Sequence, residues 1–170
     1  SGEWNCTGGI AISGSFAYAT DVHGTHCLRV IDVADPTTPR RVTELNIDYA
    51  QDVAIVGDLA FVVGGRYAGD PGQLAVVDVS APAAPHLLSS TIGGMPRRVV
   101  ATEMNAYVLD MYRGFVVFDT SSPLQPIMLA EFALTSTSTS DIAVSASRAL
   151  IAAGPDGVFL IDVDNPATPR

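Results

Sequence analysis

The stretch LRVIDVADPTTP, residues 28–39, decides the fold, because the chain carries three further versions of it. They are LAVVDVSAPAAP (74–85), FVVFDTSSPLQP (115–126) and VFLIDVDNPATP (158–169). Each version is an apolar run that ends in Asp, followed by Pro four residues later and again three residues after that. Self-similarity at a fixed period of roughly 20 to 50 residues indicates a repeat architecture. The chain is therefore interpreted as four related units.

A second shared segment precedes each of these runs and fixes the register of the units. The four copies are GIAISGSFAYATD (9–21), DVAIVGDLAFVVG (52–64), RVVATEMNAYVLD (98–110) and DIAVSASRALIAA (141–153), with Ala17, Ala60, Ala106 and Ala149 at equivalent positions. Each copy predicts two short strands, A and B, joined by a tight polar turn such as 13–15. Strand C is the run that ends in the repeated Asp, and strand D follows the prolines, as in 40–47 and 86–92.

Strand C is apolar at nearly every position, which is typical of a strand with both faces buried. Four strands per unit and no amphipathic helical stretch predict an all-β fold, a β-propeller of four-stranded antiparallel blades, with an open β-solenoid as the alternative. Residues 1–170 form one such domain, with units at about 9–51, 52–97, 98–140 and 141–170.

The runs LRVIDV…P, LAVVDV…P and FLIDV…P resemble the LVIVD repeat, a bacterial propeller repeat, and the resemblance extends over all four units. The third unit departs from it most, with Phe118, Asp119 and Thr120 in place of the usual aliphatic residue, Asp and Val. The resemblance implies the propeller fold and an exported or surface-attached protein. It implies no activity, because proteins of this family are largely of unassigned function.

The fourth unit raises the question of how the arc of blades closes. The sequence stops at Arg170, just after strand C, so the last unit lacks its outer strand, and only residues 2–4 align with such a strand ahead of the first unit. Three interpretations stay open: a compact four-bladed ring, a fragment of a longer propeller, and a half-ring that a second chain completes. We favour the fragment or the self-associating half-ring, because an unclosed arc leaves apolar blade faces bare.

Composition excludes several classes of function. The formal net charge is −9, from 18 acidic residues against nine arginines and no lysine. Nucleic-acid binding needs a basic surface, and Schiff-base and P-loop chemistry both need a lysine. The apolar runs are far shorter than the roughly 20 residues of a membrane-spanning helix. We expect no nucleic-acid partner, no membrane insertion and no cofactor.

Residues that recur in every unit are expected to serve the blade. The repeated carboxylates, Asp32, Asp78, Asp119 and Asp162, are too dispersed around a propeller to share one calcium ion. Backbone N–H groups of the proline-containing C–D turn are their expected partners.

Residues that break the repeat point to one face. The spacing from the register Ala to the repeated Asp is 13 residues in units three and four, 15 in unit one and 18 in unit two. The additional residues fall in the B–C loops 21–27 and 64–73, which emerge on the same face as the D–A loops. Insertions confined to one face usually mark the binding side. The candidate binding residues on this face are His23, His26, Asp52, Arg66, Tyr67, Arg98, Tyr112, Arg113 and Asp141.

Asp52, Arg98 and Asp141 occupy the same repeat position, at the mouth of the expected channel. Two interpretations stay open: a site for a small polar or peptidic ligand, and a structural network of arginine–carboxylate pairs. The leading functional hypothesis is a non-enzymatic, exported module whose loop face binds a protein, peptide or glycan. The alternatives are a metal-assisted hydrolase or lactonase with its site at the mouth, and a purely structural spacer. No GxSxG motif is present, so no catalytic residue is assigned.

The stretch DVHGTHC (21–27) holds an aspartate, two histidines and one of the two cysteines. The register brings Cys6 and Cys27 to the same face, and a disulfide between them is the leading interpretation. Such a bridge implies an oxidising compartment, so we expect an extracellular, surface or periplasmic location. If Cys27 is committed to this bridge, the potential zinc ligands left in the stretch are Asp21, His23 and His26 on an exposed loop. No metal site is therefore assigned.

Overall fold

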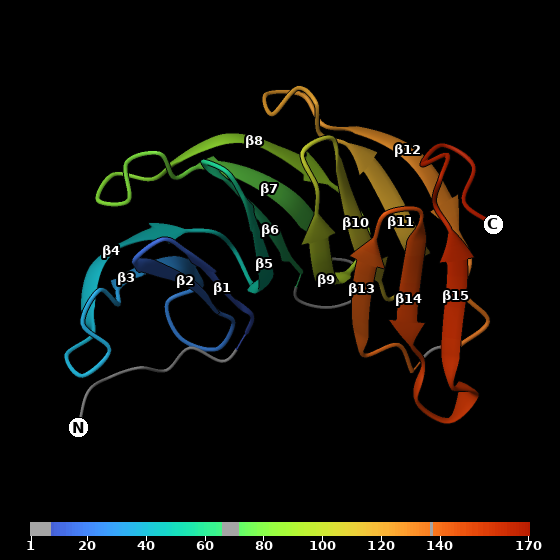
Figure 1. Ribbon diagram of the computed structural model, residues 1–170, viewed down its shortest axis with the longest axis horizontal. Coiled ribbons are helices and arrows are strands. Elements are labelled where there is room, and N and C mark those ends of the chain that lie inside the picture. The colour runs from blue at the N-terminus through green and yellow to red at the C-terminus, as the bar shows by residue number, and fades with distance from the viewer. Residues whose placement is uncertain (1–7, 66–71, 137) are drawn as a thin grey trace.

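The computed structural model describes residues 8–65, 72–136 and 138–170. Figure 1 shows four small sheets that follow one another around an open arc. Blade 1 contains β1 (Ile10–Ser13), β2 (Phe16–Asp21), β3 (Cys27–Asp32) and β4 (Arg40–Asn46), and blade 2 contains β5 (Ala50–Val56), β6 (Leu59–Gly64), β7 (Gln73–Asp78) and β8 (His86–Ile92). Blade 3 contains β9 (Pro96–Ala101), β10 (Asn105–Asp110), β11 (Gly114–Asp119) and β12 (Ile127–Phe132). Blade 4 contains β13 (Asp141–Ser145), β14 (Arg148–Ala152) and β15 (Val158–Asp162), with a short 3-10 helix, η1 (Gly154–Asp156), between the last two.

Every sheet is an antiparallel meander in chain order, which confirms the predicted propeller blades. The first strands of neighbouring blades contact one another, β1 with β5, β5 with β9 and β9 with β13, so they form the inner edge of the arc. β5 and β9 begin at Ala50 and Pro96, two residues before the expected unit starts, and an irregular register accompanies both starts. Within the described ranges no helix is long and apolar enough to cross a membrane.

The repeated aspartates have the role that the sequence predicts. In each C–D turn the carboxylate accepts a hydrogen bond from the backbone N–H two residues later, at 2.8–2.9 Å; the donors belong to Ala34, Ser80, Ser121 and Asp164. The side-chain hydroxyls of Ser80 and Ser121, together with these backbone bonds, lower the pKa of Asp78 and Asp119 below the ordinary aspartate value. The backbone bond from Asp164 and the charges of Arg148 and Arg170 lower the pKa of Asp162. The repeated carboxylates therefore hold turns, on the face opposite the B–C loops.

The A–B turns of blades 1, 2 and 4 have a left-handed residue at one shared position. Gly14 and Gly57 occupy it with φ of 57° and 56°, and Ala146 occupies it in blade 4 with φ of 50°. Glycine adopts this conformation readily, whereas a Cβ makes it costly. Blade 4 thus carries a strained turn that blades 1 and 2 avoid.

Three apolar clusters hold the arc together, one at each junction between consecutive blades. Tyr18 and Val53 belong to the cluster between blades 1 and 2, Phe61 and Val99 to the next, and further residues join blades 3 and 4. Among the described residues no such cluster joins blade 4 to blade 1, and Figure 1 shows the two end blades apart. The chain therefore forms an open arc rather than a compact four-bladed ring.

Candidate functional site

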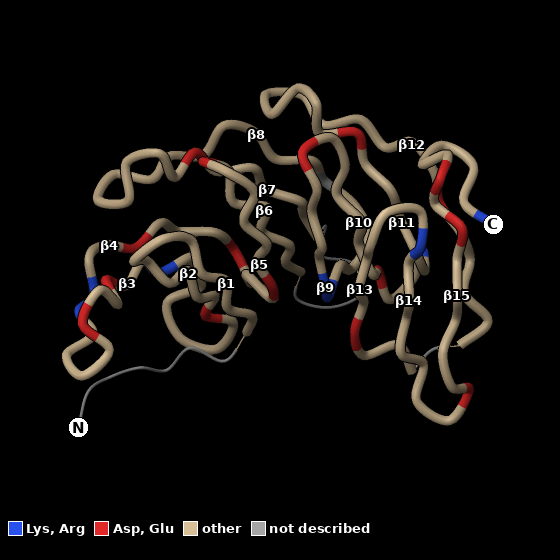
Figure 2. Tube along the Cα trace, in the orientation of Figure 1, with Lys and Arg blue, Asp and Glu red and all other residues tan. Residues whose placement is uncertain are grey.

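The D–A and B–C connections meet on one face of the arc, which we call the loop face. A cavity of about 660 Å³ opens there at the inner edge, and we call it the mouth cavity. All four blades line it, with Gly8, Gly9, Ile10, Val22, His23, Gln51, Asp52, Arg97, Arg98, Met111, Thr139, Ser140 and Asp141. Figure 2 shows the basic residues of β9 beside acidic residues of the neighbouring inner strands.

One position of the repeat supplies a residue from every blade to this cavity. Gly9, Asp52, Arg98 and Asp141 each begin their unit, and all four line the mouth cavity. This position comes just before the buried part of the inner strand of each blade. A side chain at this position therefore lies at the end of the strand that is nearest the loop face. Because the position holds a glycine, two aspartates and an arginine, it does not serve the blade in the way the repeated aspartates do.

Asp52 is fixed across a blade junction. Its Oδ2 accepts a hydrogen bond of 3.0 Å from the backbone N–H of Val99 in blade 3. Burial raises the pKa of Asp52, and the charge of Asp141 acts in the same direction, while the amides of Val99 and Val53 and the guanidinium of Arg98 oppose the shift. The carboxylate is therefore oriented by the fold and incompletely compensated in charge.

Gly9 permits the close approach of blade 1 to this carboxylate. A Cβ at Gly9 would overlap the carboxylate of Asp52, and one at Gly8 would overlap the Thr20 hydroxyl. The backbone N–H of Gly9 donates to the carbonyl of Gln51 at 2.8 Å. The two glycines thus let blades 1 and 2 meet at the cavity wall without a side chain between them.

The arginine–carboxylate network anticipated at the mouth is not formed as direct ion pairs. Among the described residues no ion pair within 4.0 Å joins Arg97 or Arg98 to a carboxylate, and Arg98 donates to the carbonyl of Arg97 at 3.0 Å. Both guanidinium groups lie at a cavity that also holds Asp52 and Asp141. The mouth therefore offers separate positive and negative groups to a polar ligand.

The DVHGTHC stretch is a loop built around Asp21. The Asp21 carboxylate accepts backbone hydrogen bonds from His23, Gly24 and Thr25 at 2.7–3.2 Å, and Arg29 pairs with it at 2.8 Å. Burial acts to raise the pKa of Asp21, but the backbone amides and Arg29 together lower it. Asp21 thus organises the loop.

The two histidines of this loop lie in different places. His23 is exposed and lines the mouth cavity. The ring of His26 packs against Tyr49 instead, with 4.2 Å between ring centroids, and His26 has a left-handed φ of 53°. The structure therefore supports His23 as a mouth residue and removes His26 from that group.

Cys27 is buried as a free thiol, with its sulfur 2.9 Å from the Thr25 hydroxyl. Burial raises the pKa of this thiol. Cys6, the partner in the expected disulfide, lies outside the described residues, and so do the candidate binding residues Arg66 and Tyr67. No group of three histidine, cysteine or acidic side chains that could hold a metal ion is present in the described part of the chain.

A second aspartate organises the B–C loop of blade 3. Asp110 Oδ1 accepts from the N–H groups of Tyr112 and Arg113 at 2.8 and 2.9 Å, and its Oδ2 accepts from Met95 at 2.6 Å. The loop presents Met111 and Tyr112 to solvent, 51% and 59% exposed. Met111 lines the mouth cavity, so this loop forms part of its rim.

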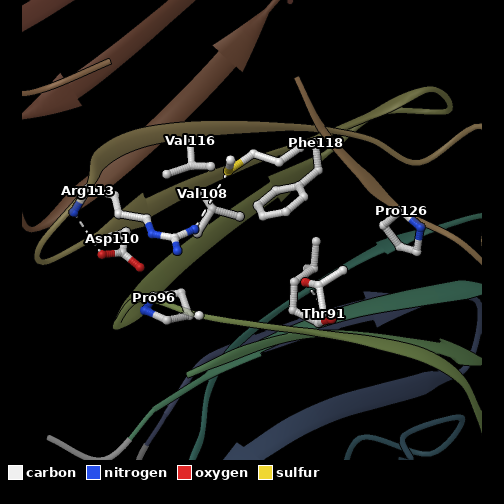
Figure 3. Close-up of a pocket in the computed structure, with 11 residues that line it drawn as sticks. Thr91, Pro96, Val108, Asp110, Arg113, Val116, Phe118 and Pro126 are labelled. Carbon is white, nitrogen blue, oxygen red and sulfur yellow. Dashed lines mark hydrogen bonds between the residues drawn. The ribbon is translucent and has the colours of Figure 1, made fainter. Parts of the chain in front are cut away.

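Arg113, at the far end of the same loop, belongs to a different cavity. This interblade cavity of about 250 Å³ lies between blades 2 and 3 and is mostly apolar, with Leu74, Val108, Val116, Phe118 and Met128 among its lining residues. Figure 3 shows the guanidinium of Arg113 at one end of the cavity and Phe118 and Pro126 at the other. Arg113 also pairs with Glu131 at 3.3 Å. The loop of Met111, Tyr112 and Arg113 therefore stands between a polar cavity and an apolar one.

The structure brings His23, Asp52, Arg98 and Asp141 together, as the repeat register predicts. Sequence reasoning missed Gln51, Thr139 and Ser140, which line the same cavity. Gln51 and Ser140 directly precede Asp52 and Asp141, and Thr139 lies one residue earlier, so the residues just ahead of the shared position were the available signal. The repeat pattern contained no corresponding feature that predicted the interblade cavity.

Comparisons with known proteins agree with this architecture. A family model described as the LVIVD repeat matches residues 6–46, 48–91, 93–133 and 136–170. A search of curated proteins gives no match. The fold is similar to the crystal structure of the computationally designed Ika4 protein, with a TM-score of 0.72 and 11% identity over 94% of this chain and 92% of that one.

Longer proteins share the fold over part of their length. The chain aligns with the computationally designed Ika8 protein at a TM-score of 0.54 and 8% identity, covering 95% of this chain and 59% of Ika8. It aligns with Kluyveromyces lactis Hsv2 at a TM-score of 0.56 and 8% identity, covering 85% of this chain and 41% of Hsv2. The chain therefore spans less than two thirds of these two proteins, and the likeness is one of fold.

Proposed function

Because the chain belongs to the LVIVD repeat family, and membership of this family indicates a propeller fold but no particular activity, we propose its function from the residues that depart from the repeat. The protein is a non-enzymatic binding module of an exported or cell-surface protein, and its loop face recognises a protein or peptide. The observation that carries this proposal is the mouth cavity, to which every blade contributes a residue from one repeat position, and that position varies between glycine, aspartate and arginine.

The charges at the mouth suit a ligand with groups of both signs. Arg97 and Arg98 make no direct ion pair among the described residues, while Asp52 is oriented by the Val99 amide. Separated charges held by a rigid scaffold favour orientation and specificity in recognition. A peptide backbone and its polar side chains supply matching donors, acceptors and charges.

The rim favours a protein or peptide over a glycan. Tyrosine, methionine and arginine are enriched in protein interfaces, and tyrosine and arginine are frequent at their energetic centres. The loop of blade 3 presents Met111, Tyr112 and Arg113 in sequence, with the first two more than half exposed. An apolar ligand side chain fits the interblade cavity beside Arg113, while a polar segment occupies the mouth.

A peptide library displayed on phage and selected against the 170-residue chain tests this proposal. We expect the strongest selected peptide to bind Arg98→Ala and Tyr112→Ala with a dissociation constant raised about tenfold or more. Arg40→Ala is the matched control, because Arg40 is exposed at the start of β4, on the opposite face. Selection of no peptide, or of one that is sensitive only to Arg40→Ala, contradicts the proposal.

The metal-assisted hydrolase and the structural spacer stay as alternative hypotheses. A spacer would tolerate Arg98→Ala and Tyr112→Ala without any change in binding. A hydrolase would show chelator-sensitive turnover in an esterase or lactonase screen.

A further inference from the structure

The outer strands of blades 1 and 3 each place two large apolar side chains in the junction with the next blade. Leu45 and Ile47 belong to the cluster between blades 1 and 2, and Phe132 and Leu134 belong to the cluster between blades 3 and 4. In each pair the first residue stands opposite the strand C residue four positions before the repeated Asp, and the second follows two residues later. Both junctions therefore use the same two positions for apolar packing.

The junction between blades 2 and 3 departs from this pattern. Its residues at the two positions are Thr91, which stands opposite Leu74, and Gly93. A small hydroxyl-bearing side chain and a glycine thus replace two large apolar side chains. The interblade cavity of about 250 Å³ lies at this place, and both residues line it. The cavity therefore coincides with a change in sequence that the other two internal junctions do not share.

The same junction carries an arginine that the other blades lack at the equivalent position. Six residues before the repeated Asp stands Arg113 in blade 3, and the equivalent residues are His26, Gly72 and Asp156. A Cβ at Gly93 would lie 2.7 Å from Nη2 of Arg113. The absence of a side chain at residue 93 therefore makes room for the guanidinium beside the cavity.

The guanidinium of Arg113 keeps hydrogen-bond donors for a further partner. Within the described ranges its side-chain partners both contact Nη1, Glu131 at 3.3 Å and the sulfur of Met128 at 3.6 Å. Nη2, on the side of Gly93, has no such contact in those ranges. Figure 3 shows the guanidinium at one end of the cavity and the ring of Phe118 at the other. The cavity thus combines a cationic donor with an apolar body.

The two carboxylates near Arg113 leave it able to bind an anion. Asp110 is 5% exposed, and its oxygens accept from the backbone N–H groups of Met95, Tyr112 and Arg113 at 2.6–2.9 Å. Its charge is therefore held by backbone amides. The side chain of Glu131 is 41% exposed, and ion pairs at such solvent-accessible positions are weak. A ligand anion can share the guanidinium with Glu131.

We propose that the interblade cavity binds a small organic acid, a carboxylate attached to one aromatic ring or to a short branched chain. Carboxylates pair with guanidinium groups through charge-assisted and frequently bidentate hydrogen bonds. An apolar cavity of about 150 Å³ holds benzene, so this larger cavity accommodates one ring and a head group. The apolar part of the acid takes the place of the side chains that Thr91 and Gly93 lack.

This inference does not rest on the proposed function. The peptide is assigned to the mouth cavity through Arg98 and to its rim through Tyr112, whereas the acid occupies the interblade cavity beside Arg113. A free acid competes with the peptide only for the place of one apolar side chain. Loss of acid binding therefore leaves recognition at the mouth in place, and loss of peptide binding leaves the acid site in place.

Titration of the methyl-labelled chain with phenylacetate and with isocaproate, followed by nuclear magnetic resonance, tests the proposal. We expect saturable binding of these acids at one site, with a dissociation constant of about 1 mM or lower. The largest shifts should fall on the methyl groups that line the cavity, those of Leu74, Val108, Val116 and Met128. Phenylacetamide, which has the same ring without the charge, should bind about tenfold more weakly or worse.

Three variants separate the contribution of the charge from that of the space. Arg113→Gln should raise the dissociation constant for phenylacetate about tenfold or more. Arg148→Gln is the matched control and should leave it unchanged, because Arg148 also has a carboxylate partner at 3.3 Å but does not line the cavity. Thr91→Leu restores the residue type of Leu45 and should abolish binding by filling the cavity, with a free energy of unfolding in urea at least equal to that of wild type.

Several results would overturn the acid site. These are equal affinity for phenylacetate and phenylacetamide, equal effects of Arg113→Gln and Arg148→Gln, and a folded Thr91→Leu variant that binds as wild type does. The absence of saturable shifts at the cavity methyl groups with both acids overturns it as well. The comparison of the acid with its amide needs no substitution, so it decides the question even where a variant fails to fold.

Discussion

The carboxylate of Asp52 accepts a hydrogen bond from the backbone N–H of Val99 across the junction between blades 2 and 3, at 3.0 Å. The two residues are 47 positions apart in the chain. The same carboxylate lines the mouth cavity, so one group both joins two blades and contributes charge to the candidate site. Asp52 therefore combines a structural hydrogen bond with a place in the candidate site.

Replacement of Asp52 separates its two roles. Asp52→Ala leaves the Val99 amide, which belongs to a buried residue, without its acceptor, so we expect a loss of about 1–3 kcal/mol in the free energy of unfolding. Asp52→Asn keeps an oxygen acceptor at the same place and should retain most of that stability. Urea unfolding of both variants at pH 7 measures the difference, and equal losses would contradict a specific role for the hydrogen bond.

The charge of Asp52 predicts a pH dependence with a definite sign. Because burial raises the pKa of Asp52 in the folded state above its unfolded value of about 3.9, the folded state binds the proton more tightly. Its contribution to stability is therefore fully present below about pH 3.9 and is lost as the pH rises through the folded pKa. The free energy of unfolding of wild type minus that of Asp52→Asn should fall across this window. A difference that rises with pH contradicts the assignment.

Asp21 and Arg29 form a buried pair whose loss should be costly. Their side chains are 0% and 7% exposed, and Asp21 also accepts three backbone hydrogen bonds. Removal of one partner of a buried pair typically costs about 3–5 kcal/mol, so Asp21→Ala should lower the free energy of unfolding by that amount. Asp164→Ala, at an exposed turn position, is the control and should change it by less than about 0.5 kcal/mol.

The strained turn of blade 4 gives a prediction in the stabilising direction. Ala146 has a φ of 50° where Gly57 has 56° in the equivalent turn. Ala146→Gly removes the Cβ conflict and should raise the free energy of unfolding by about 0.5–1 kcal/mol. The reciprocal Gly57→Ala should lower it by a similar amount. Chemical denaturation of the two variants would contradict this account if Ala146→Gly were destabilising.

The disulfide between Cys6 and Cys27 stays a prediction, as does the oxidising compartment that it implies. The thiol of Cys27 is buried in the structure, so alkylation has to be carried out on the unfolded chain. We expect protein purified from an oxidising compartment to take up two alkyl groups only after reduction, as read by intact mass. Full alkylation without reduction would contradict the bridge.

Much of the fold could be predicted from the repeat itself. The recurring Asp followed by Pro identified the C–D turn, and the structure places Asp32, Asp78, Asp119 and Asp162 on turn amides as expected. Burial of strand C was predicted from its apolar pattern, but Val158 and Leu160 of β15 are exposed. The apolar pattern of a strand indicates that both of its faces are suited to burial. Each face is buried only where another blade packs against it.

The residues of the candidate site could be predicted only where they occupy a shared position of the repeat. Asp52, Arg98 and Asp141 share a repeat position, and they share the mouth cavity. His26 instead packs on Tyr49, and Arg113 faces the interblade cavity, because both depend on loop conformations that local spacing does not encode. Tertiary packing placed these two side chains.

Backbone amide chemical shifts measured while a selected peptide is added test the central claim, that the loop face is the binding face, most directly. We predict that the largest changes fall at residues 22–23, 51–52, 97–98, 111–113 and 139–141, which belong to the mouth cavity and its rim. Changes centred on the C–D turns 33–39, 79–85, 120–126 and 163–169 would place the ligand on the opposite face and contradict the claim.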